Sequence, residues 1–373
     1  MDSVYRPMER ILLSGVGVFA IVGFLLQGFA QGGLTGALLV PLCLSLSAFT
    51  AFRLIPKSHL TAALVTGCVS AGVAWYLIRT VDSAGSIGIG FWMQVIAAWL
   101  LAWAAVEQLA SIKTLARFYK LILGIVIPLV FGAWLLVLWE LLTRGLDVPQ
   151  VLLPSPSLIA DRFAHSTSIL WADFKQTFLK AVLIGYLLGC GSGFVVAILI
   201  DRSPFLQKGL LPIGNLVSAL PIVGVAPIMV MWFGFDWPSK AAVVVIMTFF
   251  PMLVNTVAGL SAATAMQHDL MKTYAANYWQ TLIKMRLPEA LPFIFNALKI
   301  NSTLAMIGAI VAEFFGTPTV GMGFRISTEV GRMNVDMVWA EIAVAAMAGS
   351  LFYGAIALAE RVFTFWHPSI RRR

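Results

Sequence analysis

Long apolar runs separated by short polar segments make up most of this chain of 373 residues. A helix needs about 20 apolar residues to cross the hydrocarbon core of a bilayer, and these runs lack the two-residue alternation of barrel strands. The pattern therefore predicts an all-α integral membrane protein with about ten transmembrane helices. We expect these spans at about 11–30, 35–52, 60–78, 87–110, 121–142, 178–200, 209–232, 240–260, 293–315 and 337–363.

The composition supports the same class of protein. Hydrophobic residues make up 60% of the chain and charged residues only 11%, whereas a soluble domain has about 45–50% and about 25%. The first span begins within about ten residues of Met1 and no small-residue cleavage site follows it, so we expect a retained helix rather than a signal peptide.

The distribution of Lys and Arg predicts the orientation of the chain. Ten spans place both termini on one side, and the segments on that side carry about twice as many Lys and Arg residues as the others. Cytoplasmic loops are enriched in these residues, which favours both termini in the cytoplasm. The net charge of +8 is explained by orientation, and no basic run with interleaved aromatics suggests nucleic acid.

The chain is expected to divide into two parts. We expect four spans with tight connections in residues 1–118 and six spans with longer polar loops in residues 119–373. The largest loop on the predicted cytoplasmic side lies near residues 261–292, between the eighth and ninth spans.

Part of this loop can form a helix. Residues 270–286 would be helical up to Pro288, since the residue before a proline avoids the α region. Tyr274 and Tyr278, four residues apart, would then share one face. Composition alone leaves open whether such a helix lies on anionic lipid, with its aromatics in the headgroup layer, or receives a soluble partner.

The order of residues in the loop resembles the coupling loop of ABC-importer permeases. That family's pattern is E-A-A, three residues, Gly, nine residues and then I-x-L-P. Aligning Leu287 and Pro288 with its last two positions puts Met285 at the Ile position. Ala275 then stands at the Gly position and Asp269 at the first position, where it keeps the carboxylate.

Longer stretches are similar to permeases of the sulfonate, taurine and nitrate group, and they follow in the expected order. They read LLPSPSLIADRF, SALPIVGVAPIMVMWFGF, FFPMLVNTVAGL, WQTLIKMRLPEALPFIFNALKI and GAIVAEFFG. The resemblance covers about residues 119–373 and implies a six-helix importer-permease core preceded by four extra helices. Those four helices could be a lipid-facing scaffold, a clamp for the binding protein or a regulatory contact.

In that family the loop forms two short helices that dock in a cleft of a cytoplasmic ATPase. A carboxylate near a helix N-terminus can accept donors of the partner, and Tyr and Trp are common anchors of interfaces. A left-handed backbone costs Ala roughly 1–2 kcal/mol, so we expect a right-handed or shallower turn at Ala275. The coupling residues implied are Asp269, Tyr274, Ala275, Tyr278, Trp279, Met285, Leu287 and Pro288.

The resemblance also implies partners and a location. These are two copies of a cytoplasmic ABC ATPase, an extracytoplasmic substrate-binding protein, a second copy of the chain as a homodimer, and the lipid of a bacterial inner membrane. The chain lacks a Walker A pattern, so a separate chain would hydrolyse ATP and this one is not expected to be an enzyme. No HExxH or Cys/His spacing predicts a metal or another cofactor, and Cys43, Cys68 and Cys190 are interpreted as small core residues.

Two features are candidates for the translocation pathway. Pro221, Gly224 and Pro227 interrupt the seventh span; proline removes a backbone donor, and transporters often bind substrate at broken helices. A kink needed for packing is the alternative interpretation.

The second feature is Glu313, near the outer end of the ninth span. An ionisable group at membrane depth suggests function. Its carboxylate would either line a gate or pair with Arg325 or Arg332 of the following loop.

A third pattern concerns packing. Gly185, Gly189 and Gly193 form a ridge of small residues in the sixth span, which allows another helix to approach closely. The sequence leaves open whether that helix belongs to the same chain or to a second copy.

The stretch GTPTVGMGFRISTEVGRMNVDMVWAEI is most similar to the branch associated with thiamine-pyrimidine precursors and riboflavin-type vitamins. Sulfonate, taurine and nitrate are the alternatives, because specificity lies largely in the binding protein. A membrane enzyme would need reactive groups that converge at one depth, and none is evident. An ATP-independent channel or secondary carrier would not need a long helical cytoplasmic loop.

Overall fold

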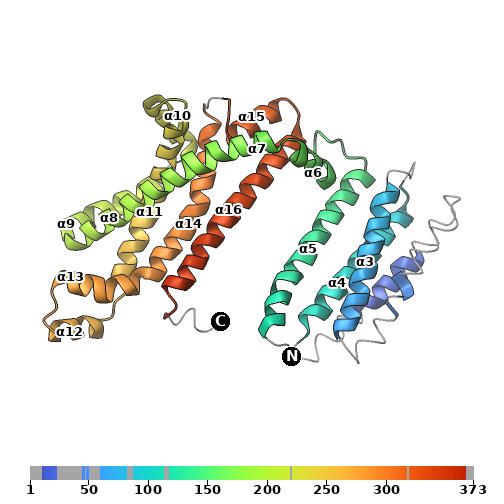
Figure 1. The fold of residues 1–373 in the computed structure, drawn as a ribbon, viewed down its shortest axis with the longest axis horizontal. Helices are drawn as coiled ribbons and strands as arrows, with labels where there is room; N and C mark the ends of the chain where they lie inside the picture. Colours follow the sequence, from blue (N-terminus) through green and yellow to red (C-terminus); the bar gives the residue numbers. More distant parts are fainter. Residues whose placement is uncertain are drawn as a thin grey trace. The chain divides into compact units, whose positions relative to one another are not determined.

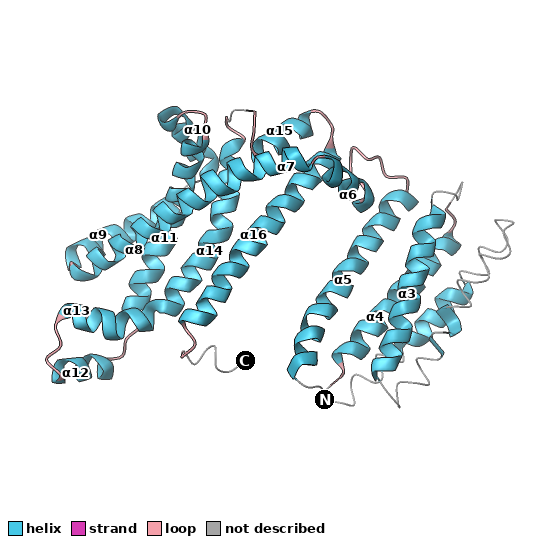
Figure 2. Ribbon diagram, in the orientation of Figure 1, coloured by secondary structure: helices cyan, strands magenta, loops and turns pink. Residues whose placement is uncertain are grey.

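The computed structural model describes residues 11–22, 44–46, 48–49, 59–81, 87–112, 117–218, 221–316 and 319–366. Within these ranges every regular element is a helix, with loops and turns between them, as Figure 2 shows. The predicted all-α class is therefore confirmed for the described part of the chain. The predicted span 35–52 and the second half of the span 11–30 lie largely outside these ranges.

The helices follow in a simple order along the chain. The first ones, after the short helical segment 11–22, are α3 (His59–Val81), α4 (Ile89–Ala110) and α5 (Arg117–Gly145). Next come α6 (Pro156–His165), α7 (Thr167–Phe174), the π-helical segment η1 (Lys175–Val182), α8 (Leu183–Arg202), α9 (Pro204–Ser218) and α10 (Ile222–Phe233). The last are α11 (Trp237–Leu260), α12 (Ala265–Thr273), α13 (Tyr278–Thr281), the π-helical segment η2 (Leu282–Arg286), α14 (Leu287–Glu313), α15 (Met322–Gly331) and α16 (Val335–Phe363).

Among the described residues, seven helical segments are long and apolar enough to cross a membrane. They are Leu60–Val81, Ile89–Ala110, Ile122–Gly145, Thr167–Arg202, Trp237–Leu260, Tyr278–Glu313 and Val335–Phe363. These seven match seven of the ten predicted spans, so the chain is an integral membrane protein. The total of ten, and the four helices expected before the core, stay predictions.

The predicted span 209–232 is not a single helix. Two shorter helices, α9 and α10, replace it, and α10 begins directly after Pro221, whose ψ of 117° is extended. A proline has no N–H to donate and restricts the residue before it, so a helix tends to stop there. Pro227 lies inside α10, where the chain stays helical.

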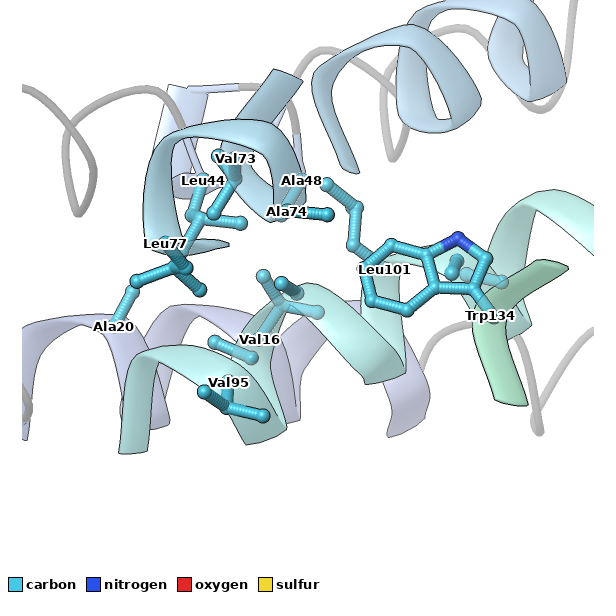
Figure 3. Packing of buried hydrophobic residues seen from close by; sticks show 14 of the residues in the cluster. Val16, Ala20, Leu44, Ala48, Val73, Ala74, Leu77, Val95, Leu101 and Trp134 are labelled. Atoms are coloured by element: carbon cyan, nitrogen blue, oxygen red, sulfur yellow. The ribbon is translucent and has the colours of Figure 1, made fainter. Parts of the chain in front are cut away.

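Contacts divide the chain into two compact units, Met1–Leu158 and Ile159–Arg373. In the first unit α5 packs on α3 and α4. Figure 3 shows the apolar core of this unit, in which Trp134 of α5 lies with Leu77 and Leu101. The sequence assigned α5 to the second part of the chain, and the division after residue 118 stays a prediction.

In the second unit α8, α11 and α14 pack against one another. The glycine ridge of α8 faces α11: a Cβ added at Gly185 would lie 2.7 Å from the carbonyl oxygen of Ala241, and one at Gly193 would lie 2.5 Å from that of Phe249. The partner of the ridge is therefore a helix of the same chain. Figure 1 places α12 and α13 at one end of this unit and α10 and α15 at the other.

Candidate functional site

The predicted coupling loop forms a helical hairpin between α11 and α14, which we call the hairpin and define as residues 265–286. The residue pattern alone predicted one helix over 270–286, whereas the family resemblance implied two short helices with a turn at Ala275. The structure has α12, a break at residues 274–277, and then α13 and η2. Because of this break Tyr274 and Tyr278 do not share a face of one helix, and that expectation is wrong.

Each helix of the hairpin begins with a capping box. The Thr264 hydroxyl accepts from the Gln267 N–H at 3.4 Å, while the Gln267 side chain accepts from the Thr264 N–H at 2.7 Å. Asn277 and Gln280 make the same reciprocal pair at 2.8 and 2.9 Å. These bonds satisfy backbone donors that a helix start leaves free. Both boxes can be recognised in the sequence as a capping residue followed three positions later by Gln, a signal that the sequence analysis did not use.

A left-handed residue ends α12. Ala275 has a φ of +50°, its N–H donates to the Lys272 carbonyl at 2.8 Å, and the N–H of Ala276 donates to the Met271 carbonyl at 3.0 Å. This pair of bonds is the Schellman motif, which requires the left-handed conformation at this position. The expectation of a right-handed turn at Ala275 is therefore wrong, because two hydrogen bonds that close the helix offset the steric cost for Ala.

The hairpin exposes a row of apolar side chains. Met266, Leu270 and Tyr274 follow one another at four-residue intervals and are 83%, 55% and 76% exposed. None of the described residues of α12 is buried. Asp269, on the same helix, pairs with Lys272 at 3.2 Å in an exposed position, where such a pair contributes little. An exposed apolar row with a polar rim is typical of a contact surface.

The second helix of the hairpin is fixed to the ends of two membrane-length helices. Arg286 binds Asp201 of α8 through two bonds, Nη1 to Oδ2 at 2.8 Å and Nη2 to Oδ1 at 2.6 Å. Its Nε donates to the carbonyl of Leu260, the last residue of α11, at 2.9 Å. The hydroxyl of Tyr278 donates to Oδ2 of Asp201 at 2.9 Å. We call this group the Asp201 clamp.

A stacked cation extends the clamp. The guanidinium of Arg202 lies 5.2 Å from the ring centre of Tyr278 and 5.6 Å from that of Trp279. Tyr278 is half-buried and packs against the core of the second unit, whereas Trp279 remains 51% exposed. Of the three predicted aromatic anchors, Tyr278 therefore holds the hairpin to its own chain, and Tyr274 and Trp279 face outward.

The end of the hairpin differs from the prediction. Leu287 stays in the α region, with φ of −67° and ψ of −45°, and Pro288 lies in the first turn of α14. A proline is tolerated there because the first turn has no intrahelical partner for its missing N–H. Pro288 therefore does not end a helix. Met285 and Leu287 are half-buried, and Leu287 packs on the core.

At the opposite end of the unit, Glu313 is buried and fully bonded. Its Oε1 accepts from the Thr177 hydroxyl at 2.8 Å, and its Oε2 accepts from the Gly323 N–H at 2.7 Å. Two orphan donors at the start of α15 are satisfied in the same way, since Thr177 accepts from Met322 and Asp173 accepts from Gly321. Glu313 thus fixes the start of α15.

The predicted pairing of Glu313 with an arginine is wrong. Arg325 pairs with Asp173 at 2.9 Å, and Arg332 pairs with Glu329 at 3.0 Å. The reason is that the α15 backbone supplies the donors that Glu313 needs, so the guanidinium groups are used elsewhere.

The α10–α11 turn contains a further set of polar contacts. Lys240, buried in α11, donates to the Phe235 carbonyl at 2.6 Å and to the Gly316 carbonyl. Asp236 caps α11 and accepts from the Trp237 N–H at 2.8 Å, and this backbone donor holds the pKa of that carboxyl below its usual range. These contacts tie the α10–α11 turn and the start of α11 to the segment after α14.

The remaining pathway candidates lie on α10. Pro221 precedes its first turn, and the Gly224 N–H donates to the Pro221 carbonyl at 2.9 Å. A Cβ at Gly224 would meet no atom within 4 Å, so this glycine is not required for packing within the described chain. The break in the helix at Pro221 is thus observed, while a role in translocation stays a prediction.

Taken together, these observations define a helical integral membrane protein that displays an amphipathic hairpin clamped to its spans. The chain belongs to the family described as the binding-protein-dependent transport system inner membrane component, whose model matches residues 172–372. That match falls within the second compact unit. The chain is thus an ABC transporter permease.

Several curated relatives have similar sequences. The riboflavin transport system permease protein RibX of Chloroflexus aurantiacus is 31% identical over 260 residues, which are 69% of this chain and 95% of that protein. The formylaminopyrimidine transport permease protein ThiX of Halalkalibacterium halodurans is 30% identical over 239 residues, 64% of this chain and 95% of that protein. The putative aliphatic sulfonates transport permease protein SsuC of Bacillus subtilis is 28% identical over 248 residues, 66% and 88% of the two chains.

The sequence analysis missed the residues that hold the site together. Arg202 and Arg286 were counted only as loop charges, and Asp201, Asp173 and Thr177 were not considered. The available signal was an Asp-Arg pair directly after the sixth span, on the same predicted side as the basic end of the loop.

Proposed function

We propose that this permease imports a small vitamin-like ring compound, such as a thiamine-pyrimidine precursor, that an extracytoplasmic binding protein delivers. A separate cytoplasmic ATPase, in two copies, binds and hydrolyses ATP, and two copies of the permease form the pathway. The riboflavin and formylaminopyrimidine permeases, at 31% and 30% identity, support the ring-compound class.

The observation that carries the coupling role is the row Met266, Leu270 and Tyr274 on a hairpin that is clamped to two spans. We propose that this row and Trp279 enter the ATPase cleft, with Asp269 at its rim. Ala275 sets the angle between the two helices of the hairpin. Tyr278, Met285, Leu287 and Pro288 hold the hairpin on the permease, since they are half-buried.

The support for the pathway residues is their position in the unit. Pro221 separates the helices α9 and α10, and Glu313 fixes α15 at the same end of the unit. We propose that Pro221, Gly224 and Pro227 allow α10 to change its angle during transport, and that Glu313 acts through the position of α15.

The coupling proposal is tested by purifying the permease after co-expression with an ABC ATPase of the same organism. A variant with Tyr274→Ala and Trp279→Ala should reduce ATPase recovery by about tenfold or more, since buried aromatic anchors contribute most to an interface. Trp75→Ala is the matched control, because Trp75 is 63% exposed on α3 of the other unit. Wild-type recovery with the double variant would contradict the proposal.

A sulfonate, taurine or nitrate importer is the second candidate, supported by the relative named for aliphatic sulfonates. Calorimetry on the binding protein encoded beside the permease distinguishes the two. Binding of a pyrimidine or a flavin supports the proposal, and binding of a sulfonate or an inorganic anion contradicts it.

An ATP-independent carrier is contradicted if the purified complex hydrolyses ATP faster with loaded binding protein.

A further inference from the structure

The Asp201 clamp divides the hairpin into an outer and an inner part. α13 and η2 carry every contact of the clamp, namely Arg286 to Asp201, Arg286 to the Leu260 carbonyl and Tyr278 to Asp201. None of the described residues of α12 is buried. A partner that pushes on α12 therefore acts on the rest of the chain through two connections, the turn at residues 274–277 and the segment 261–264 that joins α12 to α11.

The Arg286–Asp201 ion pair at the centre of the clamp is shielded from solvent and has a fixed direction. Its side chains are only 15% and 8% exposed for Arg286 and Asp201, so solvent screens their attraction weakly. A planar guanidinium that meets a carboxylate through two bonds fixes direction as well as distance. Removing one partner would leave the other as a half-buried charge without its counter-ion.

The clamp binds two helices that pack closely against one another. Asp201 lies at the end of α8 and Leu260 at the end of α11. These two helices are in backbone contact along the glycine ridge, where a Cβ at Gly189 would lie 2.9 Å from the Val245 carbonyl oxygen. The clamp thus joins α13 and η2 to a closely packed pair of helices rather than to a loop.

We propose that Asp201 and Arg286 are positioning residues that set the coupling between ATP hydrolysis and transport, and this rests on the proposed function. They touch neither solute nor nucleotide. Their contribution is to convert movement of α12 into movement of the α8–α11 pair. Loss of the clamp should leave the ATPase bound through the outer row of the hairpin while transport per ATP falls.

The test uses the complete transporter in proteoliposomes with its ATPase and loaded binding protein. Solute uptake and phosphate release are measured together, and their ratio is the readout. Asp201→Asn and Arg286→Gln should each keep ATPase recovery near wild type and lower the ratio by about fivefold or more, in the usual range of coupling between sites. The exchange Asp201→Arg with Arg286→Asp should recover at least part of the ratio, which a general loss of stability would not allow.

The matched control is a second Arg–Asp pair. Arg162 binds Asp336 at 2.8 Å between α6 and α16, with side chains 43% and 27% exposed. Arg162→Gln should leave the ratio unchanged. An unchanged ratio in both single variants of the clamp would overturn the inference.

Two outcomes separate this inference from the proposed function. If wild-type permease does not bind the ATPase, the proposed function fails. If it binds and transports but the clamp variants keep the wild-type ratio, only the inference fails. If the single variants do not fold, the same ratio is measured for Tyr278→Phe. This variant removes one hydrogen bond to Asp201 and no charge. A lowered ratio supports the clamp, and an unchanged ratio overturns it.

Discussion

At the scale of single residues, Ala275 is the most unusual position of the hairpin. Its φ of +50° is common for Gly and costly for a residue with a Cβ. The two hydrogen bonds of the Schellman motif offset this cost, because they close α12 only in this conformation. The angle between the outer and inner helices therefore depends on one strained residue.

Replacing this residue should stabilise the hairpin. Ala275→Gly removes the steric cost of roughly 1 kcal/mol, so protease cleavage within residues 265–286 should slow in the purified protein. Ala276→Gly is the control, since Ala276 does not have a positive φ, and there glycine only adds freedom to the unfolded chain. Faster cleavage of Ala275→Gly than of wild type would contradict the assignment of strain.

The sequence predicted the position of this turn but not its conformation. A resemblance of motifs placed Ala275 at the turn, yet the choice between right-handed and left-handed backbone depends on which hydrogen bonds close the helix. The clamp was harder to find, since Arg286 and Asp201 are far apart in sequence. Only the packing of α8 against α11 brings the ends of these helices together.

At the scale of elements, α8 and α11 approach one another through backbone atoms. The spacing of Gly185, Gly189 and Gly193 predicted a close contact, and the structure supplies the identity of the partner helix. The broken span at Pro221 was also visible in the sequence as a proline-rich stretch, although the division into two short helices was not predicted.

The close contact between α8 and α11 can be tested by substituting two nearby glycines of α8. Gly189→Ala should lower the melting temperature of the detergent-solubilised protein by several degrees, because its Cβ would meet the α11 backbone at 2.9 Å. Gly191→Ala, with no atom within 4 Å of its Cβ, should leave the melting temperature unchanged or raise it slightly. Equal effects of the two substitutions would contradict the packing described for α8.

The start of α15 gives a second test at this scale. Gly321 has a φ of +144°, and a Cβ there would lie 2.7 Å from Oε1 of Glu313. Gly321→Ala should therefore displace Glu313 and detach α15, which limited proteolysis of residues 319–334 would detect. Gly331→Ala, at the other end of α15 and without a close neighbour, is the control and should remain resistant.

At the scale of the whole molecule, orientation in the membrane decides what the hairpin can meet. The distribution of Lys and Arg predicts that the hairpin lies on the cytoplasmic side, and α15 lies at the opposite end of its unit (Figure 1). The sequence predicted seven of the described spans well because each is a continuous apolar run. It did not predict the contact division at Leu158, which depends on how α5 packs.

Thiol labelling tests this orientation. In a background with Cys43 and Cys68 replaced by Ala, Met266→Cys should react with a membrane-impermeant maleimide in inside-out vesicles and not in right-side-out ones. Met266 is 83% exposed, so burial does not limit the reaction. Val330→Cys, 56% exposed on α15, should show the reverse pattern. Labelling of Met266→Cys from the outside alone would contradict both the orientation and the proposed coupling.

The exposed row Met266, Leu270 and Tyr274 has a consequence for the production of this chain in the cell. Three large apolar side chains without a cover favour self-association. If the ATPase covers this row as proposed, permease synthesised in excess over the ATPase would keep the row exposed. The proposed function therefore predicts that balanced synthesis of the two subunits limits aggregation of the permease.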